Sequence, residues 1–335
     1  MRYNSIKQSV LAQFNAPQGN QIVPFILGAP GGGKSACARD IVRTWKEDFE
    51  APVVEFTASL RDPVDVMGVP ITTGDYTRWL PPEEFYSLRQ GVGPCALILE
   101  ELSDATLPMQ NALCGVIYDR RAGQLQLSDE LIIIATGNRT EDKSGANRIS
   151  SKLAGRTRRF DFTENLEDWT QWALAANLPT ELIQFLRFKP ALLSDFDPSR
   201  FANPTPRTWE KVGLIPPTMP DHLLYDTVCG DVGEGAATEY LAFKKIFGQL
   251  PNIDALLLDP ARAEVPTEPS VLFAITGALA RKTTVNNFDR VCAYIKRLPP
   301  EFSVMTVKDA LSLTNGIRHT RAFSEWASAN ADVLM

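Results

Sequence analysis

The stretch Gly28-Ala29-Pro30-Gly31-Gly32-Gly33-Lys34-Ser35 decides the fold of this chain. It matches the pattern G-x-x-x-x-G-K-[ST], follows a short apolar run at 22–27 and precedes helical spacing at 34–45. A glycine turn of this kind aims backbone N–H groups at a phosphate, and the following helix points its positive end at the same place. The stretch therefore predicts a phosphate-binding loop between a strand and a helix.

Two residues of this loop have separate expected roles. Lys34 is expected to reach the β- and γ-phosphates of ATP, and Ser35 to hold Mg²⁺. An incidental glycine-rich turn is the alternative, which the strand before and the helix after the loop disfavour. The candidate nucleotide-binding residues are Gly28, Ala29, Pro30, Gly31, Gly32, Gly33, Lys34, Ser35 and Ala36.

The rest of the first half predicts a parallel sheet around the loop. Apolar runs at 52–56, 95–99 and 131–135 have the length and continuity of strands that are buried on both faces. Helices between such strands supply the crossovers that parallel pairing needs. The Pro/Gly-rich segment at 62–82 is expected to be an insertion, with a hairpin around Thr73–Asp75, and a second hairpin is expected at 120–130.

After residue 165 the pattern becomes helical, with proline-rich joints. We expect an α/β core at 1–165 and a helical region at 166–335. Pro251–Pro269 is expected to be a connector. Helical spacing occurs at 168–176, 181–188, 207–214, 239–247, 270–281 and 288–298.

Two acids, Glu100 and Glu101, follow the apolar run at 95–99. Successive strand residues face opposite ways, so one carboxylate can organise Mg²⁺ while the other polarises water. A solvent-facing acidic strand end is the alternative, and the upstream phosphate loop disfavours it.

Three weaker signals follow. Asn138, just after the run at 131–135, is a candidate to lie beside the attacking water, although Gly-Asn is also a common turn. Arg207 follows Pro206 in the first turn of a predicted helix, where a cation is unfavourable; an exposed arginine without a role is the alternative. The cluster Arg156, Arg158 and Arg159 offers an arginine finger for a neighbouring subunit's γ-phosphate or, alternatively, solvated charges.

Composition excludes several other classes of function. Lys+Arg total 34 against 40 Asp+Glu, a net charge of −6, which disfavours bulk nucleic-acid binding. Two distant histidines, His222 and His319, disfavour a zinc site or a Ser-His-Asp triad. The five cysteines form no CxxC pair, as in a reducing compartment. No apolar stretch approaches the ~20 residues of a membrane span, so we expect a cytoplasmic protein without membrane contact.

The order of GAPGGGKS, LILEEL, ATGNR, LAGR and TPRTW resembles the AAA+ ATPases, and within them the MoxR family. Segments 62–82, 109–127 and 166–172 resemble that family's helix-2 insertion, its helix with the pre-sensor hairpin, and the start of its lid. The resemblance covers roughly 20–250. It implies an AAA+ P-loop αβα sandwich with a parallel five-stranded sheet, followed by an α-helical lid. It also implies ATP hydrolysis, a ring that is commonly a hexamer, and chaperone-like remodelling of a partner, often a von Willebrand factor A domain protein.

Position by position, the resemblance implies a role for each candidate. Lys34 and Ser35 correspond to the Walker A pair, Glu100 to the Mg²⁺ acid, and Glu101 to the catalytic acid. Asn138 corresponds to sensor 1, Arg156 to the arginine finger and Arg207 to sensor 2. Two departures stand out, because Glu100 replaces the usual aspartate and Thr157 replaces the usual phenylalanine after Arg156. Arg158 and Arg159 therefore remain alternative fingers.

The sequence thus predicts a Mg²⁺-dependent ATPase that assembles as a ring and remodels a protein. The alternatives are an ATP-binding switch or scaffold with little hydrolysis, and a nucleic-acid motor using the same core. Turnover separates the first two, and the acidic net charge favours a protein substrate over nucleic acid. Segments 62–82 and 120–130 are expected to face the ring axis.

Overall fold

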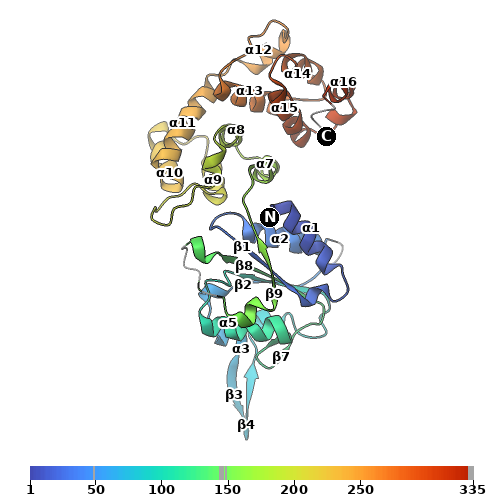
Figure 1. Ribbon diagram of the computed structural model, residues 1–335, viewed down its shortest axis with the longest axis vertical. Coiled ribbons are helices and arrows are strands. Elements are labelled where there is room, and N and C mark those ends of the chain that lie inside the picture. Colours follow the sequence, from blue (N-terminus) through green and yellow to red (C-terminus); the bar gives the residue numbers. More distant parts are fainter. Residues whose placement is uncertain (48–49, 143–146, 148, 331–335) are drawn as a thin grey trace. The chain divides into compact units, whose positions relative to one another are not determined.

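A computed structural model describes residues 1–47, 50–142, 147 and 149–330 (Figure 1). The chain divides into two compact units, Met1–Asn165 and Leu166–Met335. Within the described ranges, no helix is both long and apolar enough to cross a membrane.

The first unit contains a parallel five-stranded sheet in the order β2-β5-β8-β1-β9. The four apolar runs form the first four strands of that order, and a polar strand forms the edge beyond β1. Register pairs Gly28 with Asn138 and Thr57 with Glu100, so the carboxyl ends of neighbouring strands meet at one edge. The strands are β1 Val23–Gly28, β2 Val53–Thr57, β5 Cys95–Glu100, β8 Leu131–Asn138 and β9 Thr157–Asp161.

Helices cover both faces of this sheet. Ile26, Ile98 and Ile134 pack with α1 (Tyr3–Phe14) and α2 (Lys34–Trp45). On the opposite face, Leu97 and Ile133 pack with α5 (Leu107–Cys114). Because strand side chains alternate, each inner strand supplies both cores, and the unit is an αβα sandwich.

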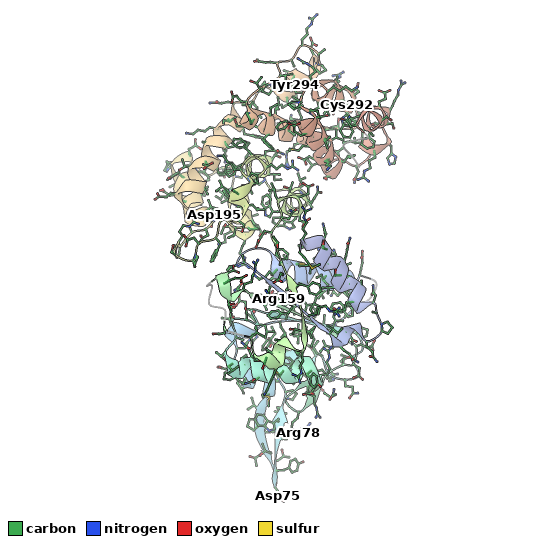
Figure 2. The ribbon with its side chains drawn as sticks, in the orientation of Figure 1. Asp75, Arg78, Arg159, Asp195, Cys292 and Tyr294 are labelled. Atoms are coloured by element: carbon green, nitrogen blue, oxygen red, sulfur yellow. The ribbon has the colours of Figure 1, made fainter. Side chains whose placement is uncertain are left out.

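Two hairpins extend from this core. Residues 62–82 contain α3 (Val64–Met67) and a hairpin of β3 (Val69–Thr73) and β4 (Tyr76–Leu80), with its turn at Gly74 (φ +64°). Figure 2 labels Asp75 at the tip of this hairpin and Arg78 on β4. The second hairpin pairs β6 (Arg121–Ala122) with β7 (Leu125–Gln126). Short helical segments complete the unit: η1 Gly19–Gln21, η2 Ala58–Leu60, α4 Glu83–Tyr86, the π-helical η3 Gly115–Asp119, η4 Thr140–Asp142 and α6 Ser151–Ala154.

The second unit is helical, as expected. It also contains helices that the spacing did not predict, among them α10 and α15, and α12 lies within the expected connector at 251–269. Its elements are α7 Leu166–Ala175, α8 Thr180–Phe188, η5 Pro190–Leu193, α9 Pro206–Gly213, α10 Asp221–Val232, α11 Glu234–Gly248, α12 Ile253–Leu258, α13 Pro269–Lys282, α14 Phe288–Ile295, α15 Pro300–Leu313, η6 Ile317–His319 and α16 Arg321–Ala329.

A buried ion pair ties α8 to α15 in this unit. Both Arg187 amino groups bond the Asp309 carboxylate, at 2.5 and 2.7 Å, and the two side chains are 8% and 1% exposed. We expect Asp309→Ala to lower the free energy of unfolding by about 3–5 kcal/mol, because it strands a buried guanidinium. Denaturant unfolding followed by circular dichroism measures the loss.

The exposed pair Lys189–Glu239, at 2.8 Å, is the matched control for this prediction. Lys189→Ala should lower the free energy of unfolding by less than about 1 kcal/mol, because water screens this pair. Equal losses in the two variants would contradict the assigned role of burial.

Candidate nucleotide-binding site

The predicted phosphate loop joins the end of β1 to the first residue of α2. Gly31 and Gly33 adopt φ values of +73° and +106°, a region that glycine enters without steric penalty. The loop therefore turns tightly into the N-terminus of α2, where unpaired backbone N–H groups and the helix dipole favour an anion.

Lys34 lies inside this loop and is only 8% exposed. Its Nζ donates to the carbonyl oxygens of Gly28 and Ala29, at 2.9 and 2.7 Å, and to Asn138 Oδ1, at 3.0 Å. Since Gly28 and Asn138 are paired on adjacent strands, the sheet register brings the candidate lysine and the candidate sensor into contact.

Asn138 is held by two residues that sequence reasoning missed. Its backbone N–H donates to Ser103 Oγ at 2.7 Å, and its Nδ2 donates to Asp104 Oδ2 at 2.9 Å. These bonds turn the amide oxygen toward Lys34. Gly137 permits the close approach of Ser103, because a β-carbon there would lie 2.7 Å from Ser103 Oγ. Ser103 and Asp104 follow the acids Glu100 and Glu101 closely in sequence, and this was the signal that could have identified them.

Glu100 ends β5 and turns toward α2. Its Oε1 accepts from Arg39 Nη2 at 2.9 Å, and Arg39 Nε also bonds Glu55 at 2.9 Å. Arg39 lies one helical turn after Ser35 on α2, so both residues share a face of that helix. Sequence reasoning missed Arg39, a residue that the longer glutamate side chain contacts here.

The chemistry of this corner fits Mg²⁺. The Ser35 hydroxyl and the Glu100 carboxylate are hard oxygen donors, and Glu100 Oε2 has no hydrogen bond among the described residues. No group of three or more His, Cys, Asp or Glu side chains suited to a metal occurs in the described ranges. Mg²⁺ usually takes one or two protein ligands together with substrate phosphates, and Ser35 and Glu100 offer two candidate oxygen ligands.

Glu101 leaves the strand and points elsewhere. Its φ is +54°, an uncommon conformation for a residue with a β-carbon that often marks functional sites. Ser59 Oγ, from η2, donates to the Glu101 carboxylate. The two acids therefore contact different neighbours, as two different roles require.

Glu164 packs against the loop from the segment after β9, and sequence reasoning did not select it. A β-carbon added to Gly32 would lie 2.1 Å from Glu164 Oε1. This oxygen is buried without a hydrogen-bond partner among the described residues. The third glycine of the loop, Gly32, thus leaves room for the carboxylate of Glu164, which a larger residue there would displace.

The three candidate finger arginines differ in their contacts. Arg158 donates to Gln13 at 2.8 Å, and Arg159 pairs with Asp161 at 2.7 Å. Arg156 instead stacks on Tyr118, with its guanidinium carbon 3.8 Å from the ring centroid. All three lie on or just before β9, the edge strand of the sheet.

Arg207 belongs to the second unit, and its role toward the phosphate loop stays a prediction. Pro206 is the first residue of α9, and Thr205 and Thr208 form a capping box there. Arg207 is exposed in the first turn.

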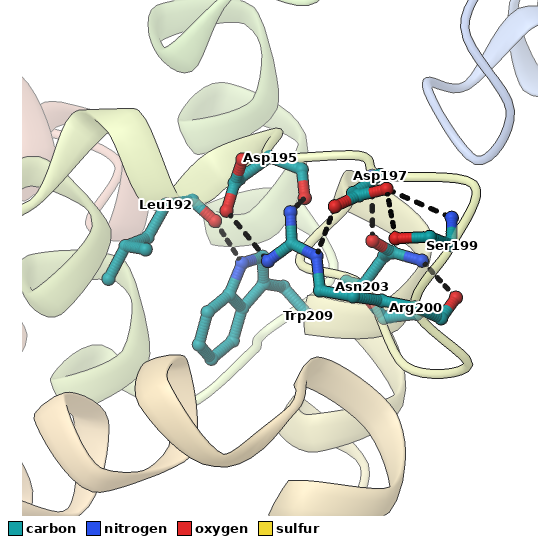
Figure 3. A network of polar contacts seen from close by, with 8 residues as sticks. Leu192, Asp195, Asp197, Ser199, Arg200, Asn203 and Trp209 are labelled. Carbon is teal, nitrogen blue, oxygen red and sulfur yellow. Dashed lines mark hydrogen bonds and ion pairs between the residues drawn. The ribbon is translucent and has the colours of Figure 1, made fainter. Parts of the chain in front are cut away.

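The segment before α9 is braced by its own side chains (Figure 3). Arg200 contacts Asp195 and Asp197, and Asn203 bonds the backbone of Asp197 and Arg200. Trp209 Nε1 donates to the Leu192 carbonyl at 2.6 Å, which anchors α9 to the segment before it. The N-terminus of α9 is therefore held in one position within its unit.

The sheet order, the glycine loop between β1 and α2, and the acids after β5 define an AAA+ P-loop αβα fold followed by a helical region. This confirms the expected fold class, while the narrower likeness to the MoxR family stays a prediction.

No family model matches the chain, and no curated protein matches it. Among solved structures, RuvB from Thermotoga maritima is similar at 13% identity and a TM-score of 0.40, over 83% of this chain and 82% of that one. NtrX from Brucella abortus in complex with ATP is similar at 13% identity and a TM-score of 0.41, and the match covers 99% of this chain and 68% of that one. These likenesses are weak, and the fold class rests on the topology.

Proposed function

We propose that this chain binds and hydrolyses Mg²⁺-ATP as a ring oligomer, and that it uses the reaction to remodel a protein partner in the cytoplasm. The observation that carries this proposal is Lys34, a buried ammonium group held between the loop carbonyls and Asn138 at the carboxyl edge of the sheet. An ammonium group at a helix N-terminus fits the β- and γ-phosphates of a nucleotide.

The residues divide the reaction among them. The loop N–H groups and Lys34 hold the phosphates, and Asn138 orients a water beside them. Glu101 accepts a proton from that water as it attacks the γ-phosphorus, and ADP leaves with its β-phosphate oxygen. Mg²⁺, held by Ser35 and Glu100, would neutralise charge between the β- and γ-phosphates. Arg207 is proposed as the sensor 2 residue, on the family resemblance alone.

Arg156 is proposed to complete the site of a neighbouring subunit. It lies just before the edge strand β9 and keeps Nη2 without a hydrogen bond to any described residue, whereas the guanidinium groups of Arg158 and Arg159 bond the side chains of Gln13 and Asp161. This difference favours Arg156 as the finger and supports the ring, which we take to be a hexamer from the family resemblance.

The hairpin of β3 and β4 is proposed as a partner contact. Val69, Ile71, Tyr76 and Leu80 are large apolar side chains that are between 38% and 66% exposed. Exposed apolar patches commonly mark protein contacts. A von Willebrand factor A domain protein is the proposed partner class, on the resemblance alone.

A switch with slow hydrolysis is the second candidate, and Glu100 favours it. Arg39 already occupies one oxygen of this carboxylate, and the strict geometry of Mg²⁺ tolerates little displacement. Steady-state release of phosphate by the purified chain with Mg²⁺-ATP decides between the two candidates. Tight binding with negligible turnover would favour the switch.

Lys34→Ala tests the phosphate loop itself. We expect ATP affinity to fall roughly 10- to 100-fold, because charge-assisted hydrogen bonds contribute about 1.5–3 kcal/mol each. Titration with a fluorescent ATP analogue measures the change. Lys46→Ala, at the opposite end of α2, is the control and should bind normally. Normal hydrolysis by Lys34→Ala would remove the nucleotide assignment.

A further inference from the structure

Arg156 is fixed by two contacts that use different parts of its guanidinium group. The face of the group stacks on the Tyr118 ring, with 3.8 Å between the guanidinium carbon and the ring centroid. One end is held by the hydrogen bond from Nη1 to the Lys152 carbonyl oxygen, at 3.0 Å. The Nε atom is buried without a hydrogen-bond partner among the described residues, and Nη2 makes no hydrogen bond to any of them, so Nη2 is the end of the group left for a ligand.

The backbone beneath this contact is unusual. Tyr118 belongs to η3, a π-helical turn over Gly115–Asp119, and Arg120 closes that turn with a φ of +53°. Turns of this kind are rare and occur frequently at functional sites. The widened turn sets the Tyr118 ring at the surface, where 62% of the residue is exposed.

An exposed aromatic residue that stacks on an arginine restricts the rotamers of the arginine side chain. A long arginine side chain at a surface samples many rotamers, and ordering it opposes any contact that it makes. The ring and the Lys152 carbonyl restrict that freedom in advance, so the cost is removed before a ligand arrives.

From these observations we propose that Tyr118 is a positioning residue for Arg156, holding its guanidinium with the free edge directed at the γ-phosphate of ATP on a neighbouring copy of this chain. The proposal rests on the proposed function and adds a second residue to the finger. Tyr118 touches no reacting atom and acts through Arg156.

The ring, rather than the hydroxyl group, carries this role. Tyr118 Oη makes no hydrogen bond among the described residues, so Tyr118→Phe should hydrolyse ATP as the parent does. Tyr118→Leu removes the ring, and kcat should fall roughly 3- to 30-fold, the range of a cation–π contact. KM for ATP and the oligomeric state should not change, because the finger meets charge that develops mainly in the transition state rather than in bound ATP.

A double-mutant cycle gives the decisive measurement. In an Arg156→Ala background, Tyr118→Leu should have no further effect on kcat. An equal fall in both backgrounds, or a normal kcat in Tyr118→Leu alone, overturns the positioning role. A normal kcat in Arg156→Ala would instead remove the finger from the proposed function, so the two failures are distinguishable.

Arg89 and Tyr86 provide a matched control in the same unit. Arg89 stacks on Tyr86 at 4.3 Å, and Tyr86 is 50% exposed. Tyr86→Leu should leave kcat unchanged, so a fall there would overturn the specificity of the Tyr118 effect. Melting temperatures verify folding, and Tyr118→Met repeats the test if Tyr118→Leu does not fold.

Discussion

Arg156→Ala should bind ATP and assemble as the parent does, yet hydrolyse ATP about 10³- to 10⁵-fold more slowly, the range that an arginine finger contributes. The transition state spreads negative charge over the γ-phosphoryl oxygens, and residues 28–35 contain Lys34 but no arginine to meet it. Phosphate release measures turnover, and analytical ultracentrifugation measures assembly. Arg158→Ala and Arg159→Ala are the controls, because Gln13 and Asp161 already engage these side chains.

Mixing subunits tests whether Arg156 acts between copies. Lys34→Ala supplies an intact finger, and Arg156→Ala supplies an intact phosphate loop. A mixed interface should therefore recover part of the turnover that neither variant shows alone. Mixed rings that form and remain inactive would contradict a role in trans, and activity lost in Arg158→Ala or Arg159→Ala would move the finger to that residue.

Glu101→Gln should retain ATP and lose turnover by about 10²- to 10⁴-fold, the usual contribution of a general base. The amide keeps the size of the side chain and can still accept the hydrogen bond from Ser59, so the local structure should persist. It cannot accept the proton of the attacking water. Single-turnover hydrolysis and nucleotide retention measure the two effects.

Glu100→Gln is the matched control at the neighbouring position. We expect it to weaken the dependence of ATP binding on Mg²⁺, because Glu100 faces α2 and Arg39. Unchanged turnover in Glu101→Gln would move the base to Glu100. With ATP retained, Glu101→Gln also provides bait for a pull-down, whose co-purifying proteins identify the partner.

The strands of the inner sheet could be predicted because their side chains are buried on both faces. Residues 95–99 and 131–135 are almost purely apolar, and the structure extends them to Glu100 and Asn138. β9 gives no such signal, because Thr157–Asp161 is a polar edge strand with one buried residue, Phe160. Helix α10 has only a weak apolar face, so the spacing of its apolar residues did not predict a helix there.

Local motifs selected Lys34 and Asn138 as candidates, but not the contact between them. The pairing of Lys34 with Asn138 follows from sheet register, which a single sequence does not state. Arg39 lies on helix α2 and Glu100 at the end of strand β5. The two residues are far apart in sequence, so no helix or strand periodicity predicts that they pair. The positive φ of Glu101 depends on tertiary contacts that no pattern encodes.

The contact between Gly32 and Glu164 constrains which residues can evolve at two positions that are far apart in the chain. A β-carbon at 32 and the present carboxylate position at 164 exclude one another. A larger residue in the loop therefore requires the side chain at 164 to be shorter or to turn away. In related sequences, a larger residue at the first position should therefore occur together with a shorter or redirected side chain at the second.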